Sequence, residues 1–236
     1  MIAANRRERQ TARVVENDLK FLNALARHND RDWLEKHRSE LEAAQQNFLH
    51  LTGGLIFVLS EFDESLTNID PKSCLFRIYR DVRFSKDKSP YKTHLAAFIC
   101  ADGKKSDTVP GYYFHIEPGG KSLFGAGYYR PARPVLAELQ KDIASPSSRI
   151  VKLLGDKALR KAFPDLSADD KLARVPRGFD KDHPQAELLK LKHVFLLTRL
   201  EDTAVIKKTF LKDLGKRAEL LCKWNLTLAG IGGASA

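Results

Sequence analysis

The spacing of hydrophobic residues changes twice along the chain. Between residues 16 and 66 they recur mostly at steps of three and four, as in helices that bury one face. Between residues 72 and 130 the period falls to about two, which is typical of strands with alternate side chains facing the core. From residue 131 to residue 230 the helical spacing returns. The pattern therefore predicts helices at both ends and a group of strands between them.

The first helices are preceded by residues that favour helix caps. Residues 1–15 are basic and lack a period, and we expect a mobile N-terminal arm there. Asn17 or Asp18 can cap a first helix, and Asn29 or Asp30 a second, longer one, because short polar side chains accept hydrogen bonds from the exposed amides of a first turn. The folded domain is therefore expected to begin near residue 16.

Short strand-like segments crowd the centre of the chain. They comprise residues 75–84, 94–101, 112–117 and 123–129, with further strands expected at 171–179 and 193–200. The turns between the first four leave no room for a helix, so these strands should form an antiparallel meander. We predict a single α+β domain over residues 16–230, in which helices from both ends of the chain cover one antiparallel sheet of about four to six strands.

Two pairs of glycines interrupt these patterns. Gly53 and Gly54 lie within a helical stripe, where each glycine costs about 1 kcal/mol relative to alanine, so a kink or a close helix contact is expected. Gly125 and Gly127 lie within a predicted strand and should let a large neighbour lie flat against it.

Composition and charge narrow the class of protein. The longest apolar run, residues 55–59, is far shorter than the roughly 20 residues of a membrane-spanning helix, and no secretory signal is expected at the N-terminus. The three cysteines are far apart and form no CxxC pair, which favours free thiols in a reducing cytoplasm. A formal net charge of +10 favours anionic partners.

The segment RIYRDVRFSKDKSPYK, residues 77–92, concentrates this charge. It carries six basic side chains and two acidic ones. Arginine is suited to bidentate recognition of phosphate or carboxylate, yet arginines on half-exposed strands also pair with neighbouring carboxylates. We therefore expect an anion site here, with a purely structural ion-pair network as the alternative.

The candidate residues extend from this segment onto the neighbouring strands. The predicted ligand-binding residues are Arg77, Arg80, Arg83, Lys88, Tyr91, Lys92, Glu117 and Tyr129. Glu117 is expected to pair with Arg77 or Arg80 across the sheet, and Tyr128 and Arg130 to line the same cavity as Tyr129. If the site is catalytic, Asp81, His115 or His183 would transfer protons. No metal-ligand spacing, nucleophile elbow or phosphate-binding loop occurs in the sequence, so we expect neither metal nor cofactor.

The basic segment also resembles a known signature. Its residues fit the pattern R-x-x-R-D-x-R-F-x-x-[DN]-K-x-x-Y at all eight defined positions, Arg77 to Tyr91. This pattern resembles that of bacterial conserved hypothetical proteins grouped as a domain of unknown function, and the similarity extends to the segments FLNALARHNDRDWLEKHR, GYYFHIEPGGKSLFGAGYYRP and RVPRGFDKDHPQAELLKLKH. The resemblance implies that the charged segment belongs to a shared design and implies no particular activity.

Three functions fit the sequence. The favoured one is a pocket for a small molecule that carries phosphate or carboxylate, with catalysis left open. The second is nucleic-acid binding through the basic arm, the lysine-rich loop and the stacking surfaces of Tyr112, Tyr113, Tyr128 and Tyr129. The third is a structural or partner-binding domain in which the arginines only hold the fold.

Overall fold

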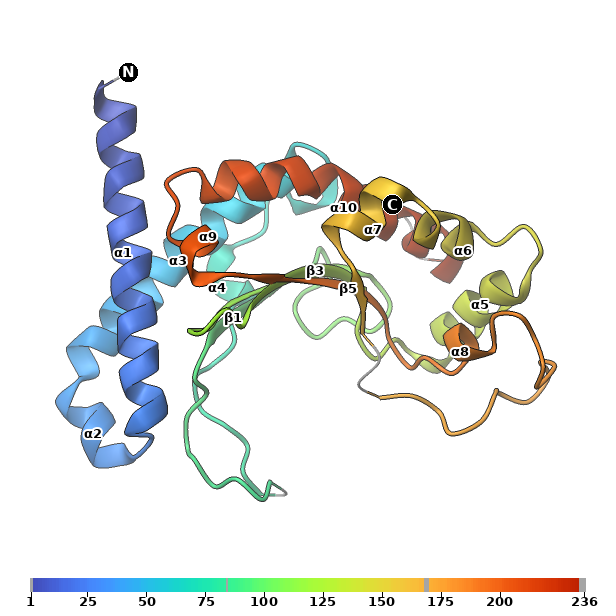
Figure 1. The fold of residues 1–236 in the computed structure, drawn as a ribbon, viewed down its shortest axis with the longest axis horizontal. Helices are drawn as coiled ribbons and strands as arrows, with labels where there is room; N and C mark the ends of the chain where they lie inside the picture. The colour runs from blue at the N-terminus through green and yellow to red at the C-terminus, as the bar shows by residue number, and fades with distance from the viewer. Residues whose placement is uncertain (1, 84, 168–169, 234–236) are drawn as a thin grey trace.

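Five strands form an open antiparallel sheet in the order β1-β2-β3-β5-β4 (Figure 1). This computed structural model describes residues 2–83, 85–167 and 170–233. The strands are β1 (Leu95–Ile99), β2 (Gly111–Ile116), β3 (Ser122–Tyr128), β4 (Asp165–Leu166) and β5 (Val194–Leu200). β1, β2 and β3 make the predicted meander, and the long connection after β3 returns β5 to its side. The predicted α+β class is confirmed.

The helices precede and follow the meander. They are α1 (Ile2–Arg27), α2 (Arg31–Lys36), α3 (Arg38–Ser60), the 3-10 helix η1 (Glu64–Leu66), α4 (Pro71–Cys74), α5 (Arg133–Ala144), α6 (Arg149–Leu154), α7 (Lys157–Ala162), α8 (Ala186–Leu189), α9 (Asp202–Val205) and α10 (Phe210–Gly232). Figure 1 shows α3, α7 and α10 on one side of the sheet, while two long loops, residues 75–94 and 171–185, extend from the other side.

The main core lies between the sheet and α3 and α10. Phe114 of β2 is fully buried; its ring centroid lies 5.6 Å from that of Phe48 in α3 and 5.9 Å from that of Phe210 in α10. Trp224 of α10 is also fully buried, and its indole N–H donates to the carbonyl oxygen of Ala126 in β3 at 3.2 Å. Burial of such aromatic side chains contributes strongly to the free energy of folding. The indole N–H keeps a hydrogen bond when it leaves water, because the Ala126 carbonyl oxygen replaces the water molecule.

Glycines permit two close contacts in this arrangement. A Cβ on Gly54 would lie 2.7 Å from Leu211 of α10, which is the close helix contact expected there. A Cβ on Gly125 would lie 2.0 Å from the carbonyl oxygen of Leu196 in β5, and one on Gly127 2.1 Å from that of Val194. The neighbour that needs this space is therefore the backbone of β5, not a large side chain.

The first predicted strand is wrong. Residues 75–84 make only isolated bridges, Leu75 with Ala97 and Tyr79 with Tyr91, and belong to the loop of residues 75–94, here called the arginine loop. Its alternating pattern arises because Ile78 is buried while Arg80 and Arg83 bond within the loop. Phe84 lies outside the described residues. The strand expected at 171–179 is also replaced by one bridge, between Lys171 and Leu191.

The N-terminal helices differ from the predicted ones in where the first helix begins and in the division of the second into two. α1 runs without a break from Ile2 to Arg27, so residues 2–15 have helical backbone and Asp18 lies inside the helix. The buried Asp18 carboxylate instead accepts a hydrogen bond of 2.9 Å from Asn47 Nδ2 in α3. Asp30 does cap α2, accepting from the Trp33 amide at 2.8 Å, but α2 and α3 are separate helices that meet at His37.

The close approach of the β5 backbone to Gly125 can be tested by a substitution that adds one methyl group. We expect Gly125→Ala to lower the free energy of unfolding by at least about 2 kcal/mol, because an overpacked methyl must displace the backbone of β5. Urea denaturation measures this effect. Gly230→Ala in α10 is the control: no heavy atom lies within 4 Å of its added Cβ, so its stability should stay equal or rise. Equal stability of the two variants would contradict the close strand approach.

Burial makes Asp18 a pH-dependent contributor to stability. Loss of hydration raises its pKa from 3.8 to about 6, and the Asn47 hydrogen bond offsets only part of this. The folded state therefore holds the proton more tightly, and the favourable contribution is lost as pH rises from about 4 to about 6. Relative to Asp18→Asn, the wild type should lose about 3 kcal/mol of unfolding free energy across that window, measured by denaturation at pH 4 and pH 7. A constant difference between the two proteins would show that Asp18 is hydrated.

Candidate functional site

A cavity of about 580 Å³ lies on the face of the sheet opposite α3 and α10. We call it the sheet cavity. Its wall comes from the arginine loop, the β1–β2 connection and the ends of β3 and β4, and its floor from the strands. The lining residues are Phe76, Lys92, His94, Ala96, Phe98, Lys104, Lys105, Ser106, Asp107, Tyr113, Leu123, Tyr129, Arg130, Ser167, Phe195 and Leu197. The volume falls within the range of roughly 300–1,000 Å³ that is typical of small-molecule sites.

The floor is apolar because the strands alternate. Phe98 of β1, Tyr113 of β2 and Leu197 of β5 share one face with Phe195, whose ring centroid lies 6.4 Å from that of Phe98. Their neighbours along each strand enter the main core on the other face. The floor can therefore accept the aromatic or aliphatic body of a ligand.

Basic side chains dominate the polar part of the lining. Lys92, Lys104, Lys105 and Arg130 line the cavity with one carboxylate, Asp107. Lys104 donates to the carbonyl oxygen of Leu75 at 2.6 Å. Among the residues that the structure describes, no carboxylate lies within ion-pair distance of Lys92, Lys105 or Arg130. Burial and the neighbouring Arg77 lower the pKa of Lys92, so a bound anion would relieve an unfavourable charge there.

Arg130 is held at the cavity by an unusual backbone conformation. Its φ angle is +54°, in the left-handed region that costs about 1 kcal/mol or more outside glycine. The Arg130 amide donates to His193 Nδ1 at 3.0 Å, and the Tyr129 ring stacks on the buried His193 ring at 4.5 Å between centroids. These contacts fix the place of both cavity residues at the end of β3.

A chain of hydrogen bonds runs from Tyr113 along the cavity face of β2. Tyr113 and His115 Nδ1 lie 2.8 Å apart, and His115 Nε2 lies 2.7 Å from the carbonyl oxygen of Lys121. Because a carbonyl only accepts, Nε2 carries the hydrogen and the Tyr113 hydroxyl donates to Nδ1. Burial lowers the pKa of His115 and, together with Glu117, raises the pKa of Tyr113. Both groups are thus neutral at neutral pH.

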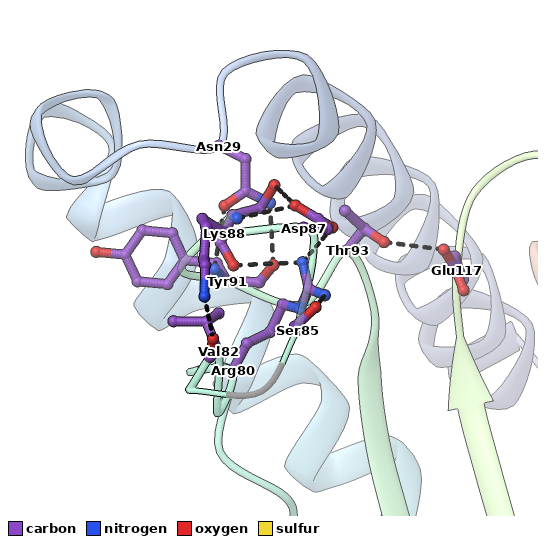
Figure 2. A network of polar contacts seen from close by, with 10 residues as sticks. Asn29, Arg80, Val82, Ser85, Asp87, Lys88, Tyr91, Thr93 and Glu117 are labelled. Atoms are coloured by element: carbon purple, nitrogen blue, oxygen red, sulfur yellow. Dashed lines mark hydrogen bonds and ion pairs between the residues drawn. The ribbon is translucent and has the colours of Figure 1, made fainter.

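His94 lies between this chain and the cavity. Its ring stacks on His115 at 4.9 Å, and its Nδ1 is 3.7 Å from Glu117 Oε2. Thr93 Oγ1 donates to the other Glu117 oxygen at 2.9 Å (Figure 2). Burial lowers the pKa of His94 to about 4, and His115 and Lys92 add to the effect. His94 was not among the residues predicted from the sequence. Its position, two residues after Lys92 and directly before β1, could have indicated that it lies beside the basic segment.

The arginine loop satisfies much of its own charge. Arg80 forms an ion pair with Asp87 and bonds to the Ser89 carbonyl oxygen at 3.3 Å, and Lys88 donates to the Val82 carbonyl oxygen at 3.0 Å (Figure 2). Hydrogen bonds from Ser89 and Arg80 lower the pKa of Asp87. Arg80 and Lys88 therefore hold the loop in shape and do not line the cavity.

Other predicted residues lie elsewhere on this loop. Arg83 binds both oxygens of Asp81, at 2.9 and 2.7 Å, and lowers the pKa of that exposed carboxyl to about 2. Arg77 is exposed beside Lys92. Tyr91 is buried, and its backbone exchanges two hydrogen bonds with the Asn29 side chain, which ties the loop to the junction of α1 and α2 (Figure 2).

The predicted residues therefore separate into groups. Lys92 and Tyr129 line the sheet cavity, and Glu117 lies behind His94; within the described residues it forms no ion pair with Arg77 or Arg80. Tyr128 is buried in the main core, where its hydroxyl donates to the Thr108 carbonyl oxygen at 3.1 Å.

Of the residues proposed for proton transfer, only His115 lies beside the cavity. Asp81 is paired with Arg83 on the arginine loop. His183 lies in the loop before α8, where Nε2 donates to the Ala144 carbonyl oxygen at 3.2 Å and Nδ1 accepts from the Gln185 amide at 3.0 Å. Their catalytic role remains a prediction, and the geometry brings neither Asp81 nor His183 to the cavity lining.

Comparison with known protein families matches residues 17–225 to the conserved hypothetical proteins designated DUF2461. The chain belongs to this family. No curated protein and no solved structure gives a match. The DUF2461 description carries no activity, so the functional argument rests on the geometry of the cavity.

Three further observations concern this DUF2461 member. Within residues 15–83, 85–167 and 170–233, no three His, Cys, Asp or Glu side chains are grouped to bind a metal ion. The helices of the same residues include none with the length and apolar character to span a bilayer. Cys74, Cys100 and Cys222 are buried free thiols, and burial raises the pKa of each.

The pKa of His94 can be measured directly. We expect its imidazole to stay neutral down to about pH 4, which NMR titration of the ring resonances will check against His94→Gln for assignment. A depressed folded-state pKa stabilises the protein above the unfolded value of 6.5, and this contribution is lost as pH falls toward 4. His94→Gln should therefore flatten the decline in stability between pH 6.5 and 4. A titration midpoint near 6.5 would contradict the burial of His94.

Proposed function

We propose that this protein binds a small organic anion in the sheet cavity. A phosphate or carboxylate group would lie among Lys92, Lys105 and Arg130, with the apolar part of the ligand on Phe98 and Phe195. The observation that carries the proposal is one cavity with four cations, one carboxylate and an aromatic floor. Cations that already converge on a preformed site hold an anion without the cost of gathering them on binding.

In this proposal the arginine loop supports the site from outside. Arg80, Asp87 and Lys88 bond within the loop, and the two ends of the loop contribute Phe76, Lys92 and His94 to the cavity. The charged residues in the middle of the loop therefore have a structural role in this proposal. The anion would be held by residues at the two ends of the loop and by the neighbouring connections.

Nucleic-acid binding is an alternative that exposed aromatic side chains on the surface support. Phe76 and Tyr129 are large exposed aromatic side chains beside Lys92 and Arg130, respectively, and stacking on such rings is a mode of single-strand binding. The sheet cavity favours a small molecule because its cations and its apolar floor enclose one space, whereas a strand-binding groove follows a backbone over many nucleotides. A structural or partner-binding role predicts no ligand effect at all.

A thermal-shift panel tests the proposal. The probes are phenyl phosphate, benzoate, inorganic phosphate and the neutral benzyl alcohol. At 100 times Kd a ligand adds about 2.7 kcal/mol, or roughly 5–10 °C in Tm for a domain of this size. We expect phenyl phosphate or benzoate to stabilise more than either inorganic phosphate or benzyl alcohol. Lys92→Met and Arg130→Met should each weaken that binding about tenfold or more, since a charged hydrogen bond is worth about 1.5–3 kcal/mol.

The control is Lys181→Met, which removes an exposed lysine outside the cavity. It should bind the probes like the wild type. A single-stranded oligonucleotide that binds more tightly than the aryl anions, with strong loss of affinity in salt, would favour the nucleic-acid alternative. Binding that is equal in all four proteins would contradict the site.

A further inference from the structure

Binding an anion does not explain why His94 lies in the cavity wall. We propose that the sheet cavity is a catalytic site in which His94 acts as a general base on the bound anion, with Glu117 and His115 as positioning residues. This inference rests on the proposed function and adds a reaction to it. It assigns the proton-transfer role to His94, which lines the cavity, and not to Asp81 or His183, which do not.

The orientation of the ring supports this role. His94 Nδ1 is the nitrogen nearest Glu117 Oε2, at 3.7 Å, and Glu117 is itself held by Thr93. Across the residues with described positions, Nε2 has no hydrogen-bond partner. A histidine with a carboxylate near one nitrogen and the other nitrogen unused is arranged to accept a proton on the unused nitrogen, while the carboxylate helps to orient the ring.

The neighbouring elements fix the ring in place. From β2, His115 stacks on one face of His94, and both nitrogens of His115 are engaged, by Tyr113 and by the Lys121 carbonyl oxygen. Each nitrogen of His115 therefore already has a hydrogen-bond partner, and the contribution of His115 is to support the His94 ring. A histidine that only filled the core would need no cavity beside it.

Burial, with smaller contributions from His115 and Lys92, keeps His94 neutral before reaction. Lys92 and His115 act in the same direction as burial, Glu117 Oε2 lies 3.7 Å from Nδ1, and Lys104, Lys105 and Asp107 line the same cavity. Burial lowers the pKa of His94 to about 4, so the unprotonated base is present at neutral pH. The same cations would stabilise negative charge that develops on a ligand oxygen.

Hydrolysis of an anionic ester is the reaction that these groups can perform with water as the co-reactant. His94 Nε2 takes a proton from water while the water oxygen forms a bond to the ester carbon or phosphorus. The bond from that atom to the leaving oxygen then breaks, and the electron pair stays on the leaving oxygen, which receives the proton back from the imidazolium. The products are an acid and an alcohol, and the base is regenerated.

The test uses two anionic aryl esters, 4-nitrophenyl phosphate and 4-acetoxybenzoate, with neutral phenyl acetate for comparison. We expect the wild type to hydrolyse at least one anionic ester faster than buffer and in preference to phenyl acetate. His94→Gln should reduce kcat at least about 100-fold, in line with general-base catalysis. Glu117→Gln should lower kcat with little change in KM, which a purely structural role would not produce.

The control is His50→Gln, which removes an exposed histidine of α3 outside the cavity lining and should keep the wild-type rate. Phenyl phosphate binding and Tm are measured on every sample, and His94→Asn is the second variant if His94→Gln does not fold. Phenyl phosphate bound without ester turnover, or turnover that survives in the folded His94 variant, overturns the catalytic inference and leaves the binding proposal standing. Failure to bind phenyl phosphate or benzoate overturns both.

Discussion

The helices cover only one face of the sheet, and this constraint shapes the rest of the molecule. Because side chains alternate along a strand, the burial of Phe114 and Ala126 under α3 and α10 forces Phe98, Tyr113 and Phe195 to the other side. That second apolar face has only loops to shield it from water, and loops of this chain are rich in lysine and arginine. An apolar floor with a basic wall is the direct outcome, and it is the chemistry on which the proposed function depends.

The arginine loop shows how a densely charged segment can be stable without a ligand. Two of its arginines find carboxylates a few residues away, Arg80 with Asp87 and Arg83 with Asp81, so these two charges are balanced locally. Exposed pairs of this kind contribute about 0–1 kcal/mol each. The attachment of the loop comes instead from the buried Ile78 and from Tyr91, whose backbone bonds to Asn29.

The sequence predicted the parts of this structure that depend on local periodicity. The strands at Leu95–Ile99, Gly111–Ile116, Ser122–Tyr128 and Val194–Leu200 follow from alternation, and the helical ends follow from the longer period. Alternation failed at residues 75–84, since a loop with one buried residue and local ion pairs has the same pattern as a half-exposed strand. Lys92, Tyr129 and Arg130 were predicted at the cavity, whereas His94 and Lys105 were not. The cavity floor also needs Phe195 and Leu197, which pairing of β5 with the distant β3 brings there, and no spacing rule contains that information.

The start of the arginine loop also has a consequence for association between molecules. β1 is an outer strand of the sheet, and Phe76 donates its amide hydrogen to the Ala96 carbonyl oxygen at 2.9 Å while Leu75 bridges Ala97. These contacts occupy backbone groups that an outer strand would otherwise present to another polypeptide. If Leu75 and Phe76 were deleted, the outer edge of β1 would be exposed. Its hydrophobic residues could then pair with a strand of another molecule, which is a route to aggregation.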